Sequence, residues 1–209
     1  MLARRVFAVG LGLFAFSEQA SATAQMSAFD PTQGFAPTLV NFDDPSGKGF
    51  TWEKSLPCGA NRATVTVRFK RAYQSGTIMP VAKVWLHSGK SGDPSEQWIA
   101  AVLKAPTDTY KLDAMEWLEK VVGSQSEGPG YAPANLSGPL QIDFAWTSDG
   151  VVSVNFGGEF VKYIKTNEPI SDIGLSVSWA KFEFIGLKVG RAGAPDPACA
   201  SKTLLAHLD

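Results

Sequence analysis

The segment Val81–His87 holds one candidate ligand-binding face, because polar and aromatic side chains alternate there with aliphatic ones. Lys83, Trp85 and His87 occupy every second position. Alternate residues of a strand project from the same face, so this spacing predicts an aromatic ring flanked by two hydrogen-bonding side chains. Such a combination suits carbohydrate, because sugars stack their CH-rich faces on indole and offer hydroxyl groups to polar partners.

Further polar side chains extend this candidate face if their segments belong to the same concave sheet. Arg68 lies on one alternating segment, and Gln141 and Asp143 lie on another. Together they would surround Trp85 with hydrogen-bonding groups. The alternative is that Trp85 packs beneath a loop or helix and that its polar neighbours on the strand are only solvated.

The stretch from Gly123 to Gly138 is rich in Gly, Pro and Ser, has no periodicity of its own, and carries Tyr131. Loops of this length in a compact domain are commonly either functional or mobile. Tyr131 is therefore included among the candidates. The full candidate ligand-binding set is Trp85, Lys83, His87, Arg68, Gln141, Asp143 and Tyr131.

The segments that would position these side chains are short and alternate with a period of two. Ala63–Phe69 is the clearest, with β-branched residues throughout. Thr147–Gly150 predicts a tight hairpin turn, and a change of phase at Ile185–Gly186 predicts a β-bulge. The predicted strands are 63–69, 81–87, 97–103, 140–146, 152–156, 159–165, 173–179 and 182–189, with edge strands near 39–42 and 50–53.

This pattern predicts an all-β fold, an antiparallel, jelly-roll-like β-sandwich, because buried strands of a parallel sheet would be continuous apolar runs. One short helix is expected to interrupt it. Asp113 and Glu116 have capping-box spacing before an apolar stripe, and Gly123 stands where a helix commonly ends. We therefore predict a helix over 114–122. A second helix is expected over 202–208 at the C-terminus.

The N-terminus has the three parts of a secretory signal peptide. Two arginines precede an apolar run over residues 6–16, and small residues in A-x-A order follow it. The run is shorter than the roughly 20 residues of a membrane-spanning helix, so we expect cleavage near Ala22 or Ala24 and no membrane insertion afterwards. The expected location is secreted or periplasmic. The expected domains are a signal peptide (1–24), a flexible segment (25–34), a β-sandwich (35–190) and a C-terminal tail (191–209).

The sequence has only two cysteines, Cys58 and Cys199. In an oxidising compartment they are expected to form one disulfide that ties the tail back to the sandwich. Metal binding by two cysteines without a nearby histidine is disfavoured. Structural calcium at Asp43–Asp44 or at Asp149 is an alternative to ordinary turn chemistry. No other cofactor is expected.

The charge distribution argues against a nucleic-acid partner. The chain has 19 Lys and Arg against 20 Asp and Glu, and the two signs are interspersed. A nucleic-acid-binding surface would need basic residues clustered on one face.

The stretch Gly138–Val189 resembles the back half of a concanavalin A-like lectin/glucanase sandwich. In that superfamily a strand ending in tryptophan leads into a G-x-V-x-V strand and a glycine turn, and an F-x-F strand closes the sheet. The matching residues here are Phe144–Trp146, Gly150–Val154, Gly157–Gly158 and Phe182–Phe184. The resemblance covers about a quarter of the chain and implies a fold rather than an activity.

The sequence departs from the catalytic patterns of this superfamily. Glucanases carry E-x-D-x-E or E-x-D-x-x-E on one strand, which is absent here. Retaining hydrolysis needs two carboxyl groups about 5 Å apart. The set implied by similar alginate lyases is present only as fragments, namely Arg68, His87 and Lys162–Tyr163.

Three functional hypotheses follow. The first is an exported, non-catalytic sandwich that binds carbohydrate or another cell-envelope ligand around Trp85. The second is a polysaccharide lyase or hydrolase, with His87 as the general base and Arg68 offsetting substrate charge. The third is a structural or assembly protein of the envelope.

Overall fold

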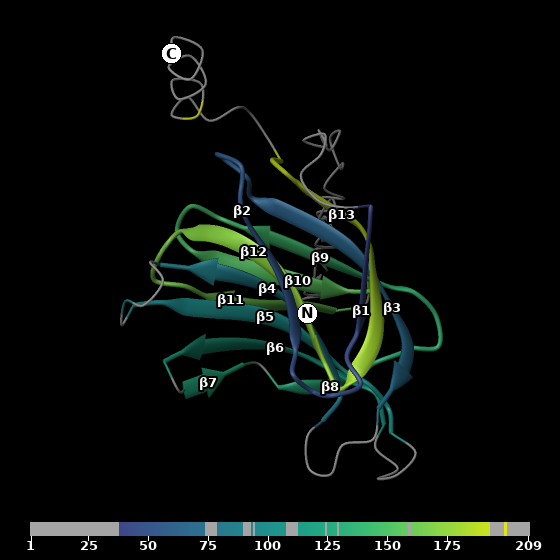
Figure 1. Ribbon diagram of the computed structural model, residues 1–209. Coiled ribbons are helices and arrows are strands. Elements are labelled where there is room, and N and C mark those ends of the chain that lie inside the picture. The colour runs from purple at the N-terminus through teal and green to yellow at the C-terminus, as the bar shows by residue number, and fades with distance from the viewer. Residues whose placement is uncertain are drawn as a thin grey trace, which may run out of the picture.

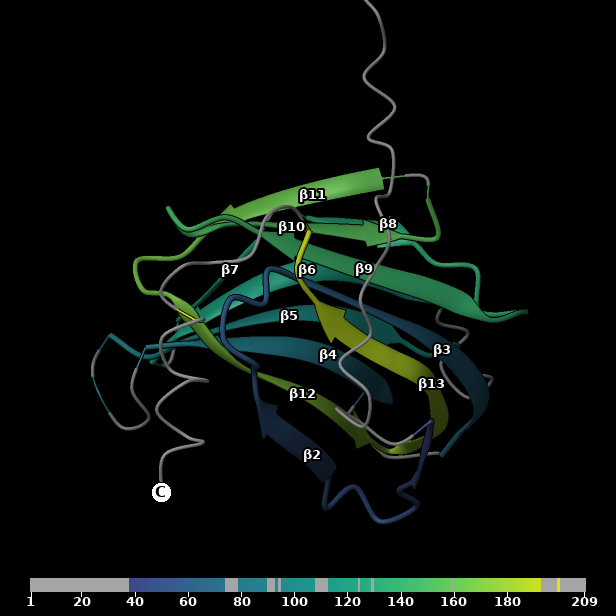
Figure 2. The same ribbon diagram turned by 90° about the horizontal axis from the view of Figure 1, so that it is seen from above.

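The described part of the chain folds as two antiparallel β-sheets packed face to face, as Figures 1 and 2 show. This computed structural model describes residues 38–73, 79–89, 93, 95–107, 113–123, 125–128, 130–158, 160–192 and 199. The predicted signal peptide, the segment 25–34 and the helix 202–208 lie outside these residues. Within them, no helix is long and apolar enough to cross a membrane.

The two sheets contain every strand that the sequence predicted. The first sheet has, in spatial order, β1 (Leu39–Asp43), β13 (Ala180–Gly190), β3 (Arg62–Ala72), β9 (Leu140–Trp146), β10 (Val151–Phe156) and β11 (Phe160–Lys165). The second has β2 (Phe50–Ser55), β12 (Ile170–Ser178), β4 (Val81–Ser88), β5 (Gln97–Lys104), β6 (Met115–Val122) and β7 (Gln125–Glu127), with β8 (Tyr131–Pro133) also paired to β6. The all-β antiparallel sandwich is thus confirmed, and β1 and β2 are edge strands as expected.

Apolar side chains from the inner faces of both sheets form the main core. Phe144 and Phe182 come from the six-stranded sheet, and Leu86 and Ile99 from the seven-stranded sheet; each is at most 1% exposed. Burial of a side chain of this size stabilises the fold by about 1.5–3 kcal/mol. The core therefore fixes which face of each strand points outward.

Two local features predicted from turn chemistry are present. In the β9–β10 hairpin the amide of Thr147 donates to the carbonyl of Val151, and Gly150 has a φ of 82°. In β13 the pairing with β3 shifts between Ile185 and Lys188, with Gly186 at a φ of 63°. Both glycines adopt the left-handed backbone that other residues reach only with strain.

The predicted helix over 114–122 is wrong, because Met115–Val122 is strand β6. It pairs with β5 along its whole length, so Leu118 lies opposite Ala101 and faces the core, whereas Trp117 lies opposite Val102 on the outer face. The spacing of Asp113 and Glu116 that suggested a helix cap also occurs in a strand whose residues alternate between two faces. Pairing on both edges and burial of one face outweigh the local helical signal.

The corner where β1 leads to β2 is fixed by the fully buried Asp44. Its carboxylate accepts hydrogen bonds from the backbone amides of Gly49 (3.0 Å) and Trp179 (3.3 Å) and from the hydroxyl of Ser46 (3.2 Å). Burial raises the pKa of this carboxyl, but the hydrogen bonds outweigh it and hold the pKa below 3.8. Because Trp179 joins β12 to β13, Asp44 ties together two connections between the sheets.

The predicted disulfide is present. Cys58 follows β2 and Cys199 belongs to the tail, with their Cα atoms 5.6 Å apart. The bond closes a loop across 141 positions of sequence. A cross-link across so long a loop removes much conformational freedom from the unfolded chain.

We expect the double variant Cys58→Ser, Cys199→Ser to lose about 5 kcal/mol of unfolding free energy according to the chain-entropy relation. Urea denaturation followed by tryptophan fluorescence measures this loss. The matched control is the parent protein under reducing conditions, which should behave like the double variant. Equal unfolding midpoints for the oxidised parent and the double variant would show that the bond contributes nothing.

Candidate functional site

The outer face of the seven-stranded sheet carries the first three candidate residues. Ala82, Val84 and Leu86 of β4 belong to the main core, whereas Trp85 belongs to a second apolar cluster on the opposite side. Lys83 and His87 share the parity of Trp85. The alternation read from the sequence therefore placed this face correctly.

Trp85 is nevertheless buried, with only 6% of its surface exposed, which corrects the expectation of an exposed stacking platform. Its indole lies over the backbone of Gly174 on β12, where an added Cβ would be 2.0 Å from the ring. The ring of Trp98 on β5 meets it edge to face, with centroids 4.6 Å apart. Trp85 thus forms the floor of the outer face and cannot offer a flat surface to a sugar.

Next to Trp85 on the outer face, an ion pair connects β4 to β6 across β5. Lys83 Nζ lies 2.6 Å from Glu119 Oε1, and Trp117 Nε1 donates to Glu119 Oε2 at 3.2 Å. Between them β5 presents only Ala100 and Val102. These small side chains leave room for the ion pair, which fixes the carboxylate beside the ring of Trp117.

The accessible aromatic surface lies farther along, where β6 meets β8. Tyr131 is 69% exposed, and its ring contacts that of Trp117 edge to face with centroids 5.1 Å apart. The two rings and Glu119 line a pocket of about 380 Å³, together with Ser126, Glu127, Gly128 and Gly130. The loop predicted to be functional or mobile therefore contributes a wall of this pocket.

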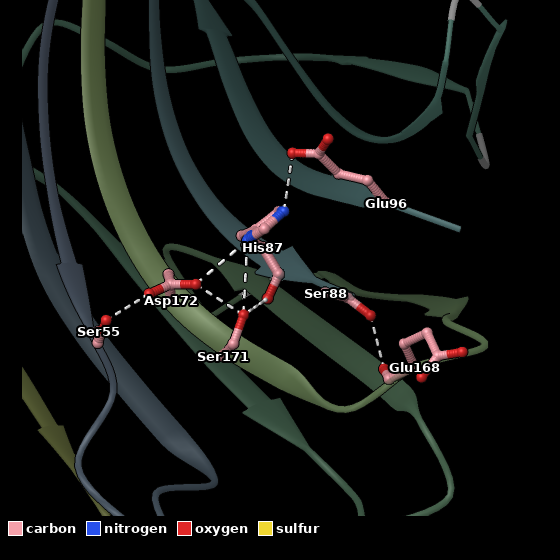
Figure 3. Close-up of polar contacts among 7 residues, drawn as sticks. All are labelled: Ser55, His87, Ser88, Glu96, Glu168, Ser171 and Asp172. Atoms are coloured by element: carbon pink, nitrogen blue, oxygen red, sulfur yellow. Dashed lines mark hydrogen bonds and ion pairs between the residues drawn. The ribbon is translucent and has the colours of Figure 1, made fainter. Parts of the chain in front are cut away.

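His87 lies in a polar cluster at the other end of the floor, drawn in Figure 3. The side chain is 5% exposed, with Nδ1 3.1 Å from Asp172 Oδ2 and Nε2 3.0 Å from Glu96 Oε1. Ser55 and Ser171 donate to the two oxygens of Asp172 at 2.7 and 2.6 Å. Two carboxylates therefore hold the ring from opposite sides.

The electrostatics of Asp172 follow from these contacts. Partial burial raises the pKa of this carboxyl, but hydrogen bonds from Ser171, Ser55 and His87 outweigh burial. The result is a pKa below the ordinary 3.8. Asp172 is thus ionised at neutral pH and acts as a hydrogen-bond acceptor only.

Three candidates lie on the other sheet, which corrects the expectation of one shared face. Arg68 of β3 pairs with Glu183 at 3.2 Å. Gln141 of β9 donates to Asp143 at 2.8 Å. Because β3 and β9 belong to the six-stranded sheet, none of these side chains adjoins Trp85. They form a separate polar surface.

The same separation removes the lyase arrangement considered from sequence. His87 and Arg68 belong to different sheets, and both imidazole nitrogens are held by carboxylates. Lys162 and Tyr163 take opposite directions, as parity predicted. The ammonium of Lys162 lies 3.3 Å from the carbonyl of Glu116, while Tyr163 is 63% exposed.

The turns considered for calcium have protein partners for their carboxylates. Asp43 pairs with Lys181 at 2.8 Å and contacts the hydroxyl of Tyr73. A hydrogen bond from Thr147 lowers the pKa of Asp149. Ordinary ion pairs and turn contacts account for both.

A second hollow of about 550 Å³ lies near the disulfide, at one end of the sandwich. Trp146 lines it but is only 7% exposed. The side-chain amide of Asn61, also in its wall, exchanges hydrogen bonds with the backbone of Ala192. Trp146 is thus buried and the amide of Asn61 is bonded to the backbone, whereas Tyr131 in the first pocket presents an exposed ring.

Sequence reasoning missed several residues of the outer face. Trp117 and Glu119 were assigned to the helix that proved to be β6, although they alternate in the right phase. Trp98 lies in a nearly continuous apolar run whose faces the sequence did not distinguish. Asp172 and Gly174 alternate along their strand, so the sequence could have placed Asp172 on the outer face. It could not show that β12 pairs with β4, which brings Asp172 beside His87.

Comparison with solved structures places this arrangement among known folds. An endo-acting O-glycanase of the human gut microbiota shares 9% identity at a TM-score of 0.51, covering 74% of this chain and 79% of that chain. The chain has a concanavalin A-like fold. The Bacillus licheniformis beta-glucanase shares 9% identity (TM-score 0.49, 74% and 78% covered), and the carbohydrate-binding module CBM66 of Bacillus subtilis shares 12% (0.46, 71% and 84%). At such identities the likeness concerns the fold alone. No protein-family model matches the sequence, and no curated protein matches it either.

We expect Gly174→Ala to lower the unfolding free energy by about 1–3 kcal/mol, because its methyl group would overlap the indole of Trp85. Tryptophan emission should also shift to longer wavelength as the ring moves into solvent. Gly138→Ala is the matched control, since a Cβ there meets nothing within 4 Å. Equal stability of the two variants would contradict the packing described for Trp85.

Proposed function

We propose that this protein binds carbohydrate on the outer face of the seven-stranded sheet, at the pocket formed by Trp117, Tyr131 and Glu119. The observation that carries the proposal is an exposed tyrosine ring in contact with a half-buried tryptophan ring, beside an oriented carboxylate. Tyr131 is 69% exposed, so its ring is available for stacking. The ligand class is a glycan, free or as part of the cell envelope.

The chemistry of the pocket supports this class of ligand. Two rings in edge-to-face contact offer surfaces at an angle, which can hold successive sugar units. The Glu119 carboxylate, fixed by Lys83 and Trp117, offers an acceptor to hydroxyl groups. A pocket of about 380 Å³ has the size of a small-ligand site.

The fold supports the proposal more generally. Carbohydrate-binding modules, lectins and glycanases share the concanavalin A-like sandwich. We further infer that the signal predicted over residues 1–24 exports the protein, which would expose this face to extracellular or periplasmic glycans. The pocket at Tyr131 contains two carboxylates, Glu119 paired with Lys83 and Glu127 paired with Lys120. The proposed role is binding rather than catalysis, because both carboxylates are held in ion pairs.

The test is affinity electrophoresis of the purified protein through gels that contain mucin, β-glucan, xylan or alginate, followed by calorimetry on the polymer that retards it. We expect Trp117→Ala and Tyr131→Ala each to weaken binding at least about tenfold, since truncating a stacking ring removes most of a hot-spot contact. Circular dichroism confirms that each variant keeps the β-sandwich.

Tyr163→Ala is the matched control, because this tyrosine is 63% exposed on β11 of the other sheet. Its removal should leave binding unchanged. The proposal is wrong if both pocket variants keep parental affinity, if Tyr163→Ala loses as much as they do, or if no polymer retards the parent protein.

A further inference from the structure

The second polar centre of the outer face gathers ligand-type atoms from three adjacent strands. His87 of β4 directs Nδ1 toward Asp172 of β12, at 3.1 Å from Oδ2 (Figure 3). Glu53 of β2 completes the group, and one ligand atom from each of the three side chains lies within 4.8 Å of the others. The set therefore combines a buried imidazole with two carboxylates of different exposure.

Glu96 determines how the ring presents itself to this group. Its Oε1 lies 3.0 Å from Nε2 of His87, on the side away from Asp172. A carboxylate can only accept, so Nε2 carries a proton and donates it. Asp172 is likewise an acceptor only, so either a proton or a cation must lie between Nδ1 and Oδ2 to relieve the repulsion of their lone pairs. A bound cation would take the place of the proton that His87 otherwise donates to Asp172.

We propose that His87 Nδ1, Asp172 and Glu53 bind a divalent transition-metal ion of the zinc class. Two ligands of a tetrahedral ion at about 2.1 Å lie roughly 3.4 Å apart, a few tenths of an ångström more than the 3.1 Å between Nδ1 and Oδ2. Glu53 is exposed and can rotate to complete the set. An imidazole ligand favours zinc-class ions over calcium or magnesium, which prefer oxygen alone.

The surroundings supply the supporting hydrogen bonds that such sites need. Glu96 holds the imidazole through Nε2, as carboxylate groups do in carboxylate–histidine–metal triads. Ser55 and Ser171 hold both oxygens of Asp172. Three protein ligands leave a coordination position on the exposed side of Glu53, where water or a ligand oxygen can bind.

The metal proposal stands apart from the carbohydrate proposal. The ion would lie over β2, β12 and β4, whereas the pocket of Trp117 and Tyr131 lies at β6 and β8. Metal binding can therefore be measured without any glycan. Failure of one proposal leaves the other intact.

The experiment titrates ZnCl₂ into the protein at pH 7.5 by calorimetry, after dialysis against EDTA and removal of the chelator. We expect one Zn²⁺ per chain in the parent, and at least tenfold weaker binding in Glu53→Gln and Asp172→Asn. Glu96→Gln should weaken binding about tenfold through the orientation of the ring. Asp143→Asn, on the opposite sheet, is the matched control and should match the parent.

Long-range ¹H–¹⁵N spectra of His87 provide a second readout, which does not depend on a variant that fails to fold. Zn²⁺ should shift Nδ1 as a metal-bound nitrogen while Nε2 stays protonated. A ring that remains doubly protonated in excess Zn²⁺ overturns the proposal, because a proton then takes the place of the metal. Binding through Nε2, or equal binding by the parent and Glu53→Gln, also overturns it.

Discussion

The packing of Trp85 over Gly174 determines how the outer face of the seven-stranded sheet is organised. A side chain at position 174 would collide with the indole, so the ring can lie flat only because this residue has none. The buried ring closes the middle of the face and supports Trp98. Two centres remain on either side of it: an aromatic pocket at β6 and β8, and a histidine held by carboxylates at β4 and β12.

The side chains on the two sides of Trp85 make different kinds of interaction. The Lys83–Glu119 pair crosses over small residues of β5 and keeps a carboxylate beside Trp117. The contacts of His87 instead bring three strands together at a buried imidazole. One centre offers rings and an acceptor to solvent, whereas the other gathers acceptors around a cation or a proton. The aromatic pocket and the histidine centre both lie on the outer face because the main core fills the inner face of the sheet.

The sequence predicted the sandwich because its strands alternate, and it placed Lys83, Trp85 and His87 on one face for the same reason. Alternation gives the face of a residue but not the neighbour of its strand. Arg68, Gln141 and Asp143 were grouped with Trp85 although β3 and β9 belong to the other sheet. The depth of Trp85 depends on Gly174, almost ninety positions away. At Met115–Val122 a capping signal favoured a helix while the alternation favoured a strand. The segment forms strand β6 because it pairs with β5.

The most direct test follows the indole N–H signals of the six tryptophans in a ¹H–¹⁵N spectrum while a retained glycan is added. If the outer face of the seven-stranded sheet binds the glycan, the signal of Trp117 moves most, because its indole N–H donates to Glu119 inside the pocket. The signals of Trp146 and Trp179 stay in place. Movement of Trp146 with Trp117 unchanged would place the ligand in the hollow near the disulfide and contradict this account.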